Sequence, residues 1–331
     1  MLKTKKHIEI VRSTVSCLSS MSQESCASIL TILNKHYTNV GVTIVNTLID
    51  LEGLIASRPD LVFLGMEFIP LNLSLGLADP NRIWIAEYLD KYKIAYTGSN
   101  EVTHQLSRDK DVAKQLVLEK GLETPPFFVI KQNQSMVEKD LLLTYPLFIK
   151  PVNRGGGLGI DSQSVVYNFS QLCWKINSIT INYKSDSLVE EYLPGREFSV
   201  AILKEENSAR FLMMPIELIA PIDKKGVRML SGRVKSDNSE QAIVVNDKNI
   251  KSQVVGLALN VFKTLSARDY GRIDIRFNKH SKPQFLEANL IPSLISGYGS
   301  FPKACVLNIG LDYESMIIRI VKLGLVRDVA R

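Results

Sequence analysis

The sequence contains few cysteines and histidines, with four of each among its 331 residues. Cys17, Cys26, Cys173 and Cys305 stand far apart, no two have the CxxC spacing, and the histidines do not cluster with them. Structural zinc sites need closely spaced ligands, and disulfide frameworks need paired cysteines. The sequence therefore argues against both kinds of site and favours a reducing compartment.

The sequence also lacks a long apolar run. A membrane-spanning helix needs ~20 consecutive apolar residues, and no uninterrupted run approaches that length. The chain begins with Lys3, Lys5 and Lys6, but Glu9 and Arg12 interrupt what would be the apolar core of a signal peptide. We therefore expect a soluble, cytoplasmic protein without a membrane partner.

Basic residues are only in mild excess over acidic residues. Forty basic residues stand against 34 acidic ones, for a net charge of +6, and the aromatic residues form no stripe with the basic ones. We expect no nucleic-acid partner, because small polyanionic ligands account for the same excess. A hydrophobic content of 45% in 331 residues allows sizeable cores and two or three domains.

Two runs near the carboxyl end predict a β-hairpin. Residues 270–277 and 283–289 are rich in branched and aromatic side chains, and polar turn-forming residues separate them. Side chains alternate between the faces of a strand, so a four-residue turn would set Asp274 opposite Glu287. One face should then carry Arg272, Asp274, Glu287 and Asn289, and the opposite face Leu286 and Ala288.

The polar face of this hairpin has the ligand types of a hard divalent cation. Mg²⁺ prefers oxygen ligands, takes few protein carboxylates and completes its coordination with water and phosphate oxygens. Asn289 adds an oxygen without a third negative charge, and a cation would relieve the repulsion between Asp274 and Glu287. The residues alone leave two interpretations open, a metal site or a hairpin with a solvated polar face.

The first 100 residues alternate between expected strands and helices, which is typical of an α/β domain with a parallel sheet. A further helix should run from Pro80 to Tyr92, with Asp79 as its N-cap. The expected strands are 7–11, 42–45 and 61–65, and the expected helices between them are 25–35 and 51–57.

A glycine-rich loop follows the expected strand at 147–150. Four of the five residues from Gly155 to Gly159 are glycines, so backbone N–H groups can approach an anion closely. The loop is not a Walker A loop, and a hairpin continuation at 164–166 does not fit the Rossmann fingerprint. By itself the pattern is more typical of a mobile loop than of an anion cradle.

Two other segments contain candidate ligand residues. A strand at 188–191 ends in Glu190 and Glu191, which are either solvated or placed at a hinge that holds a base and a sugar. The segment 224–246 is polar, basic and long for a connection, which is typical of a lid or a disordered loop. Its cations would suit phosphates, namely Arg228, Arg233 and Lys235. Further helices are expected at 107–120, 250–266, 301–308 and 313–323.

Together these motifs resemble the ATP-grasp superfamily, and within it the D-alanine–D-alanine ligase branch. The resemblance covers about two thirds of the chain, from near Tyr96 to the end. It rests on YTGS (96–99), SRDKDVAK (107–114), FIKP with the glycine loop (148–159), LVEEYLPGREFSVAIL (188–203), GRIDIRF (271–277) and FLEANLIP (285–292).

The resemblance implies an ATP-grasp fold, α/β overall and α+β in its ATP-binding part. An N-terminal parallel-sheet domain (1–100) would precede a central domain (101–186) and a C-terminal domain (187–331) that clasp ATP. The C-terminal domain would include the metal site and a lid at 221–246.

The resemblance also assigns roles to residues. The nucleotide contacts would be Lys110, Lys150, Gly155, Gly156, Gly157, Gly159, Glu190, Glu191, Tyr192, Leu193 and Glu197. The Mg²⁺ ligands, with Mn²⁺ as an alternative metal, would be Asp274, Glu287 and Asn289. The catalytic residues would be Arg272, Arg233 and Lys235, and the substrate serines are sought among Ser293, Ser296 and Ser300.

The implied reaction is the ligation of a small carboxylic acid to an amine, such as amino acids or small peptides, through an acyl phosphate. The resemblance also allows a homodimer.

The sequence departs from the family pattern on the substrate side. Gly156 and Gly157 stand where the family has serines, Val234 replaces its catalytic tyrosine, and Leu18 replaces the glutamate that binds the ammonium of the first D-alanine. Arg233 in place of a lysine keeps a cation. We therefore expect a ligase with altered specificity. The alternatives are a genuine D-alanine–D-alanine ligase, an inactive ATP-binding protein, and a kinase-like enzyme that releases the acyl phosphate.

Overall fold

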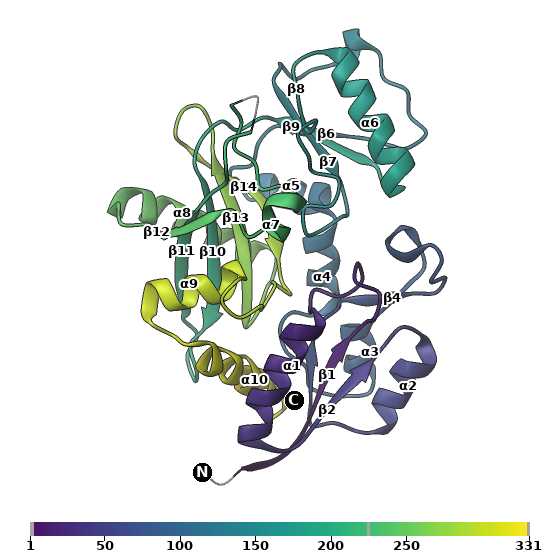
Figure 1. Cartoon of the computed structure of the whole chain (residues 1–331), viewed down its shortest axis with the longest axis vertical. Coiled ribbons are helices and arrows are strands. Elements are labelled where there is room, and N and C mark those ends of the chain that lie inside the picture. The colour runs from purple at the N-terminus through teal and green to yellow at the C-terminus, as the bar shows by residue number, and fades with distance from the viewer. Residues whose placement is uncertain (1–2, 224–225, 330–331) are drawn as a thin grey trace.

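The structure is a computed structural model that describes residues 3–223 and 226–329. In this part of the chain the strands form one parallel sheet, two antiparallel sheets and a two-stranded ribbon (Figure 1). The parallel sheet and the four-stranded antiparallel sheet lie toward opposite ends of the long axis (Figure 1). No helix in the described ranges is long and apolar enough to cross a membrane.

The parallel sheet contains the three strands expected in the first 100 residues. It has the order β2-β1-β3, with β1 (Thr4–Arg12), β2 (Tyr37–Ile44) and β3 (Leu61–Leu64). The crossovers are α1 (Gln23–His36) and α2 (Leu48–Ala56). The hydroxyl of Ser22 caps α1 by accepting a hydrogen bond from the N–H of Ser25 at 3.1 Å. The crossovers thus bring the carboxyl ends of β1 and β3 to the same edge of the sheet.

The helix expected to begin at Pro80 begins later. Residues after β3 form a ribbon of β4 (Phe68–Pro70) and β5 (Arg82–Trp84), and α3 spans Ile85–Lys91. Asp79 is therefore not an N-cap. Its carboxylate accepts hydrogen bonds from the backbone N–H groups of Asn72 and Asn81 and closes the loop before β5, which includes a short 3-10 turn at Gly76–Ala78.

The single helix expected at 107–120 is two helices. α4 (Glu101–Arg108) and α5 (Lys110–Glu119) meet at Asp109, whose φ of −86° and ψ of 88° break the helical path. The side chain of Asn100 caps α4 by accepting from the N–H of Thr103. The break places Lys110 at the first position of α5, directly beside the cleft described below.

The four-stranded antiparallel sheet has the order β6-β9-β7-β8 and is packed against α6 (Phe169–Tyr183). A short turn at Glu138–Asp140 lies in the connection before β7. The predicted hairpin after the glycine-rich loop is confirmed, because β8 pairs with β7. The strands are β6 (Phe127–Ile130), β7 (Leu147–Pro151), β8 (Val165–Val166) and β9 (Ser187–Glu191).

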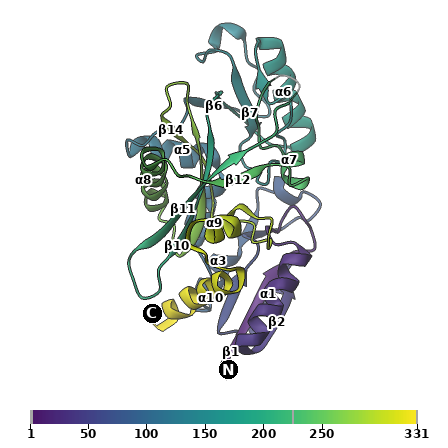
Figure 2. The ribbon, with the colours of Figure 1, turned by 60° about the vertical axis from the view of Figure 1, so that its left-hand side comes forward.

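The five-stranded antiparallel sheet has the order β12-β11-β10-β13-β14 and carries α8 (Lys248–Thr264) and α9 (Ser300–Ile309) on opposite faces (Figure 2). Alternation along β10 explains this arrangement, because Val200 and Ile202 pack with α8 while Ala201 and Leu203 pack with α9. The strands are β10 (Glu197–Lys204), β11 (Phe211–Ile219), β12 (Gln241–Val244), β13 (Tyr270–Phe277) and β14 (Pro283–Asn289).

The last described helix packs against elements from the beginning of the chain. α10 (Tyr313–Val329) packs against α1 and β3, so one core contains residues of the parallel sheet and of the five-stranded sheet. The segment predicted to be a lid or a disordered loop contains α7 (Gly232–Ser236) and β12 within its described residues. Residues 224 and 225, which belong to this predicted segment, lie outside the described residues.

The predicted pairs on the polar face of the hairpin are confirmed, but the four-residue turn is wrong, because Phe277 pairs with Pro283 and leaves residues 278–282 in the turn. Asp274 pairs with Glu287 and Arg272 with Asn289. The pairing then shifts by one residue, because Ile275 pairs with Phe285, so Leu286 is an extra residue in β14. The expectation that Leu286 faces away from the polar groups is therefore wrong, since this bulge lets it line the same cleft as Glu287.

The interior position of β13 in its sheet predicts a large effect when one of its core side chains is shortened. Ile273 is 0% exposed and packs among the residues between the sheet and α8. Ile273→Ala should lower the free energy of unfolding by about 2–5 kcal/mol, measured by urea denaturation. The control Ile49→Ala removes a side chain that is 78% exposed and should change stability by less than about 0.5 kcal/mol. Equal effects of the two substitutions would contradict the core assignment.

Candidate active site

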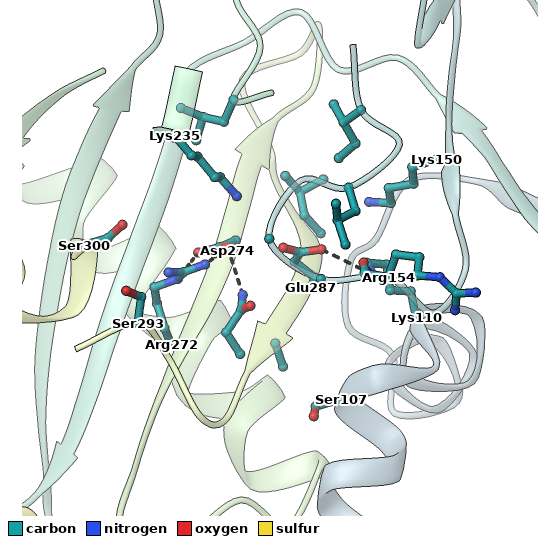
Figure 3. A pocket seen from close by; sticks show the side chains of 18 of the residues that line it. Ser107, Lys110, Lys150, Arg154, Lys235, Arg272, Asp274, Glu287, Ser293 and Ser300 are labelled. Atoms are coloured by element: carbon teal, nitrogen blue, oxygen red, sulfur yellow. Dashed lines mark hydrogen bonds and ion pairs between the residues drawn. The ribbon is translucent and has the colours of Figure 1, made fainter. Parts of the chain in front are cut away.

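A cleft with a volume of about 540 Å³ lies between the parts of the chain that carry the three sheets. Figure 3 shows side chains that line it. It is lined by the loop after β1, the α4–α5 junction, β7 with its glycine-rich loop, the end of β9, and the polar face of β13 and β14. The cleft brings together most of the predicted site residues, namely Lys110, Lys150, Gly155, Gly156, Glu190, Glu191, Tyr192, Leu193, Glu197, Lys235, Arg272, Asp274, Glu287, Asn289, Ser293 and Ser300. The remaining four predicted residues, Gly157, Gly159, Arg233 and Ser296, do not line it.

One wall of the cleft is a buried network of opposite charges. Glu190 lies 2.9 Å from Lys150 Nζ and 3.0 Å from Lys114 Nζ. Burial raises the pKa of Glu190, but the charges of Lys114 and Lys150 outweigh burial and lower it. Burial lowers the pKa of Lys150, but Glu190 and Glu287 outweigh burial and raise it. Both Glu190 and Lys150 are therefore held in their charged forms.

The sequence predicts no role for Lys114, although the motif SRDKDVAK contains it. Lys114 is fully buried and also donates to the hydroxyl of Thr124 at 2.8 Å and the carbonyl of Phe285 at 3.2 Å. It therefore ties α5 to β9 and to β14. A fully buried lysine needs an anionic partner, and Glu190 is that partner. A buried glutamate that needs a second cation is the signal that could have pointed to Lys114.

Lys110 begins the next part of the network. Its ammonium donates to the carbonyl of Arg154 at 2.6 Å and lies 3.8 Å from Glu287. Burial lowers the pKa of Lys110 to about 8, and Glu287 only partly opposes this. Burial raises the pKa of Glu287, but Lys110, Lys150 and Lys235 outweigh burial and lower it to about 2. Glu287 is thus a carboxylate at all ordinary pH values.

The polar face of the hairpin forms the opposite wall. Arg272 binds Asp274 through two hydrogen bonds, from Nε at 2.9 Å and from Nη2 at 2.8 Å. Ser199 and the amide of Asn289 also donate to Asp274, at 2.8 Å and 3.1 Å. Glu197 pairs with Arg276 at 3.0 Å, and Arg276 also donates to the backbone carbonyl of Arg228. Arg276 thereby links the sheet to the segment that carries α7.

The three predicted metal ligands fit a divalent cation by their chemistry. They offer two carboxylates and one amide oxygen on neighbouring strands, which is the kind of set that Mg²⁺ accepts when phosphates complete its coordination. No group of three or more histidine, cysteine or acidic side chains in the described ranges could hold a metal; here the third ligand is Asn289. Arg272 already binds both oxygens of Asp274, so the guanidinium and a metal would compete for them.

The glycine-rich loop lies directly against α7. A Cβ at Gly157 would lie 2.9 Å from the backbone nitrogen of Gly232, and the φ of Gly157 is +80°. Both the close approach and the left-handed backbone conformation require glycine there. Gly159, with a φ of +77°, packs against Pro151. These two glycines shape the loop, whereas Gly155 and Gly156 line the cleft.

The structure places the two predicted catalytic cations of this segment differently. Lys235 lines the cleft and points from α7 toward Asp274 (Figure 3). The Arg233 side chain is 90% exposed and lies 3.4 Å from Asp237. Of these two residues, Lys235 is therefore the one that reaches the cleft. At the far end, Ser293 and Ser300 line the cleft, whereas Ser296 is exposed outside it.

A family model described as the D-alanine–D-alanine ligase C-terminus matches residues 116–322. The D-alanine–D-alanine ligase of Aquifex aeolicus (strain VF5) is 31% identical over 273 residues, which cover 81% of this chain and 84% of the relative. The chain belongs to the D-alanine–D-alanine ligase family. A second D-alanine–D-alanine ligase, from Hydrogenovibrio crunogenus (strain DSM 25203 / XCL-2), is 25% identical and covers 72% of each chain.

The architecture agrees with this family. The crystal structure of a D-alanine–D-alanine ligase from Bacillus anthracis complexed with ATP matches 98% of this chain and 99% of that chain, with a TM-score of 0.74 and 20% identity. The predicted ATP-grasp fold is confirmed. The prediction that the protein is an ATP-dependent ligase forming carbon–nitrogen bonds is confirmed at the level of the D-alanine–D-alanine ligase family.

The charge state of Lys110 predicts a pH dependence of nucleotide binding by this family member. Its pKa of about 8 means that the ammonium is charged below pH 8 and is lost as the pH rises through this value. The affinity for ADP, measured by calorimetry at fixed Mg²⁺, should therefore fall about tenfold between pH 7.5 and 9. Lys110→Met should bind ADP more weakly at pH 7.5 and show a shallower decline. A wild-type affinity that is constant up to pH 9 would contradict the role of Lys110.

Proposed function

We propose that this protein is an ATP-dependent ligase that joins a small carboxylic acid to an amine through an acyl phosphate, and that it does not use two D-alanines as its preferred pair. The observation that supports this best is the contrast between the two parts of the cleft. The part that carries Lys110, Lys150 and Glu287 holds the charges that a nucleoside triphosphate and its cation need. The part near Leu18 lacks the groups by which the family holds D-alanine.

Different residues of the cleft would bind different parts of the nucleotide. Lys110, Lys150 and Lys235 present positive charge to the phosphates, and the backbone at Gly155 and Gly156 can donate to them. Glu190 to Leu193 and Glu197 would hold the base and the ribose. Asp274, Glu287 and Asn289 would hold Mg²⁺ or Mn²⁺, which supplies charge neutralisation for the phosphates when it is bound.

The chemistry proceeds in two steps on this chain. The carboxylate of the donor acid attacks the γ-phosphorus of ATP in line, ADP leaves, and an acyl phosphate forms. The amine then attacks the acyl carbon, the tetrahedral oxyanion lies beside a guanidinium, and inorganic phosphate leaves. Arg272 is the guanidinium on the polar face of the hairpin, and its role is to stabilise that oxyanion.

Three features support altered specificity. Leu18 is 7% exposed, lines the cleft and cannot bind an ammonium group. Gly156 and Gly157 supply no hydroxyl, and Val234 cannot donate or accept a side-chain hydrogen bond. These positions form the substrate network of the family, so the same fold is expected to hold a different acid or amine. The relatives themselves support genuine D-alanine–D-alanine ligation equally well, which keeps that activity as the alternative.

An assay of ADP release decides between the two functions. Purified protein with ATP and Mg²⁺ is tested with D-alanine and with panels of other amino acids, dipeptides and hydroxy acids. We expect D-alanine to be a poor substrate and another acid–amine pair to have a kcat/KM at least about tenfold higher. Robust turnover with D-alanine alone would overturn altered specificity. ATP binding without turnover for any acid would favour an inactive nucleotide-binding protein.

The metal ligands give a second test. Asp274→Asn and Glu287→Gln should each lower Mg²⁺-dependent ADP release by at least about a hundredfold, because each removes a negative charge from the cation site. Both variants should keep the wild-type circular dichroism spectrum and should bind Mn²⁺ more weakly by electron paramagnetic resonance. The control Asp312→Asn changes a carboxylate on the surface before α10. Full activity of both site variants would refute the metal assignment.

A further inference from the structure

We propose that the end of the cleft formed by the first 100 residues binds a second anionic group on the donor acid, through Arg108 and Arg154. This inference rests on the proposed function and names the class of its substrate. Both arginines line the cleft, Arg108 at the end of α4 and Arg154 immediately before the glycine-rich loop. The preferred donor is therefore an acid with two negative groups, one to be phosphorylated and one to be held here.

Arg108 has the bidentate edge of its guanidinium unused. Its Nη1 donates to Glu67 at 3.0 Å, which fixes the side chain. Its Nε and Nη2 are buried and have no hydrogen-bond partner among the described residues. Elsewhere in this molecule the same edge binds a carboxylate, as Arg272 binds Asp274. An arginine fork matches the two oxygens of a carboxylate or phosphate, so an anion is the expected partner.

Arg154 has a charge that no described carboxylate neutralises by contact. The side chain is buried, and its hydrogen bonds go to neutral oxygens of Leu77, Asn153, Tyr183 and Lys184. Burial and, after it, the nearby charges of Arg108 and Arg82 together lower its pKa to about 10. Neutral acceptors orient a guanidinium but do not balance it, so this arginine also favours an anion.

The acidic groups nearby do not remove this preference. Glu67 is the carboxylate that lines this end of the cleft, and it is held by Arg108. The carboxylate of Asp79 accepts hydrogen bonds from backbone N–H groups of its own loop. Asp109 does not line the cleft. Arg82 lies near the same groups but is directed to the carbonyls of Asp79 and Leu77.

The position of the two arginines fits a donor rather than the nucleotide base. Lys110 is two residues from Arg108, donates to the backbone carbonyl of Arg154 and lies 3.8 Å from Glu287. Both arginines therefore belong to the part of the cleft that contains Lys110, where Figure 3 labels Arg154. The γ-phosphate of ATP is the other anion that could reach them. The experiment therefore measures the acid and ATP separately.

The test compares acids that differ only in their second charge. D- and L-glutamate are compared with D- and L-glutamine, and succinate with succinamate, both as donors in ADP release and by calorimetric binding to the protein with ADP and Mg²⁺. We expect at least one dicarboxylate to bind about tenfold or more tightly than its amide. Arg108→Met and Arg154→Met should each reduce this ratio about tenfold, and Arg108→Lys should reduce it less than Arg108→Met.

Two further variants control for loss of folding and for loss of a positive charge. Arg108→Met with Glu67→Gln avoids leaving a buried carboxylate unpaired, and Arg210→Met removes an 84% exposed arginine as the matched control. Equal binding of dicarboxylates and amides to the wild type would overturn the inference. So would variants that raise only the KM for ATP, because the arginines would then serve the γ-phosphate. Absence of ADP release with every acid would refute the proposed function, while calorimetry would still decide the subsite.

Discussion

The structure depends on the burial of five charged groups in one place. Lys110, Lys114 and Lys150 face Glu190 and Glu287 at the meeting point of the sheets. A lone buried ion would cost several kcal/mol, so each group is tolerable only while the others remain in position. Three cations against two carboxylates leave one positive charge in excess, which suits a polyphosphate. The same contacts hold α5, β7, β9 and β14 around the cleft, so charge balance and cleft shape have a common origin.

Much of this cleft could be predicted from the sequence where local rules decide. Strand alternation was enough to place Asp274 and Glu287 on one face, but the expected turn length was wrong, because Phe277 pairs with Pro283 and the bulge at Leu286 offsets the longer turn. The extra residue Leu286 was not predictable, since a bulge changes the alternation without a sequence signal. The choice of Lys235 over Arg233 as the cation facing the cleft depends on where a single short helix lies against the glycine-rich loop. Such a placement is a tertiary property.

The two ends of the cleft, one proposed to bind the nucleotide and one the acid, differ in how they are built. The proposed nucleotide end is built largely from strands and buried ion pairs, which tolerate little change. The proposed substrate end is lined by Leu18 and Arg154, which lie in loops, and by Arg108 at the end of α4, although the three are far apart in the sequence. Loops on a rigid scaffold can change their side chains without loss of the fold. This accounts for a resemblance that assigns more residues to the nucleotide than to the acid.

The contact between Gly157 and Gly232 has a consequence for how the enzyme turns over. The glycine-rich loop and the short helix α7 meet backbone to backbone, with no room for a side chain between them. If the proposed function holds, the loop and the helix would have to move together when a nucleotide binds or leaves. A methyl group at Gly157 would lie 2.9 Å from the backbone nitrogen of Gly232 and would push the two segments apart.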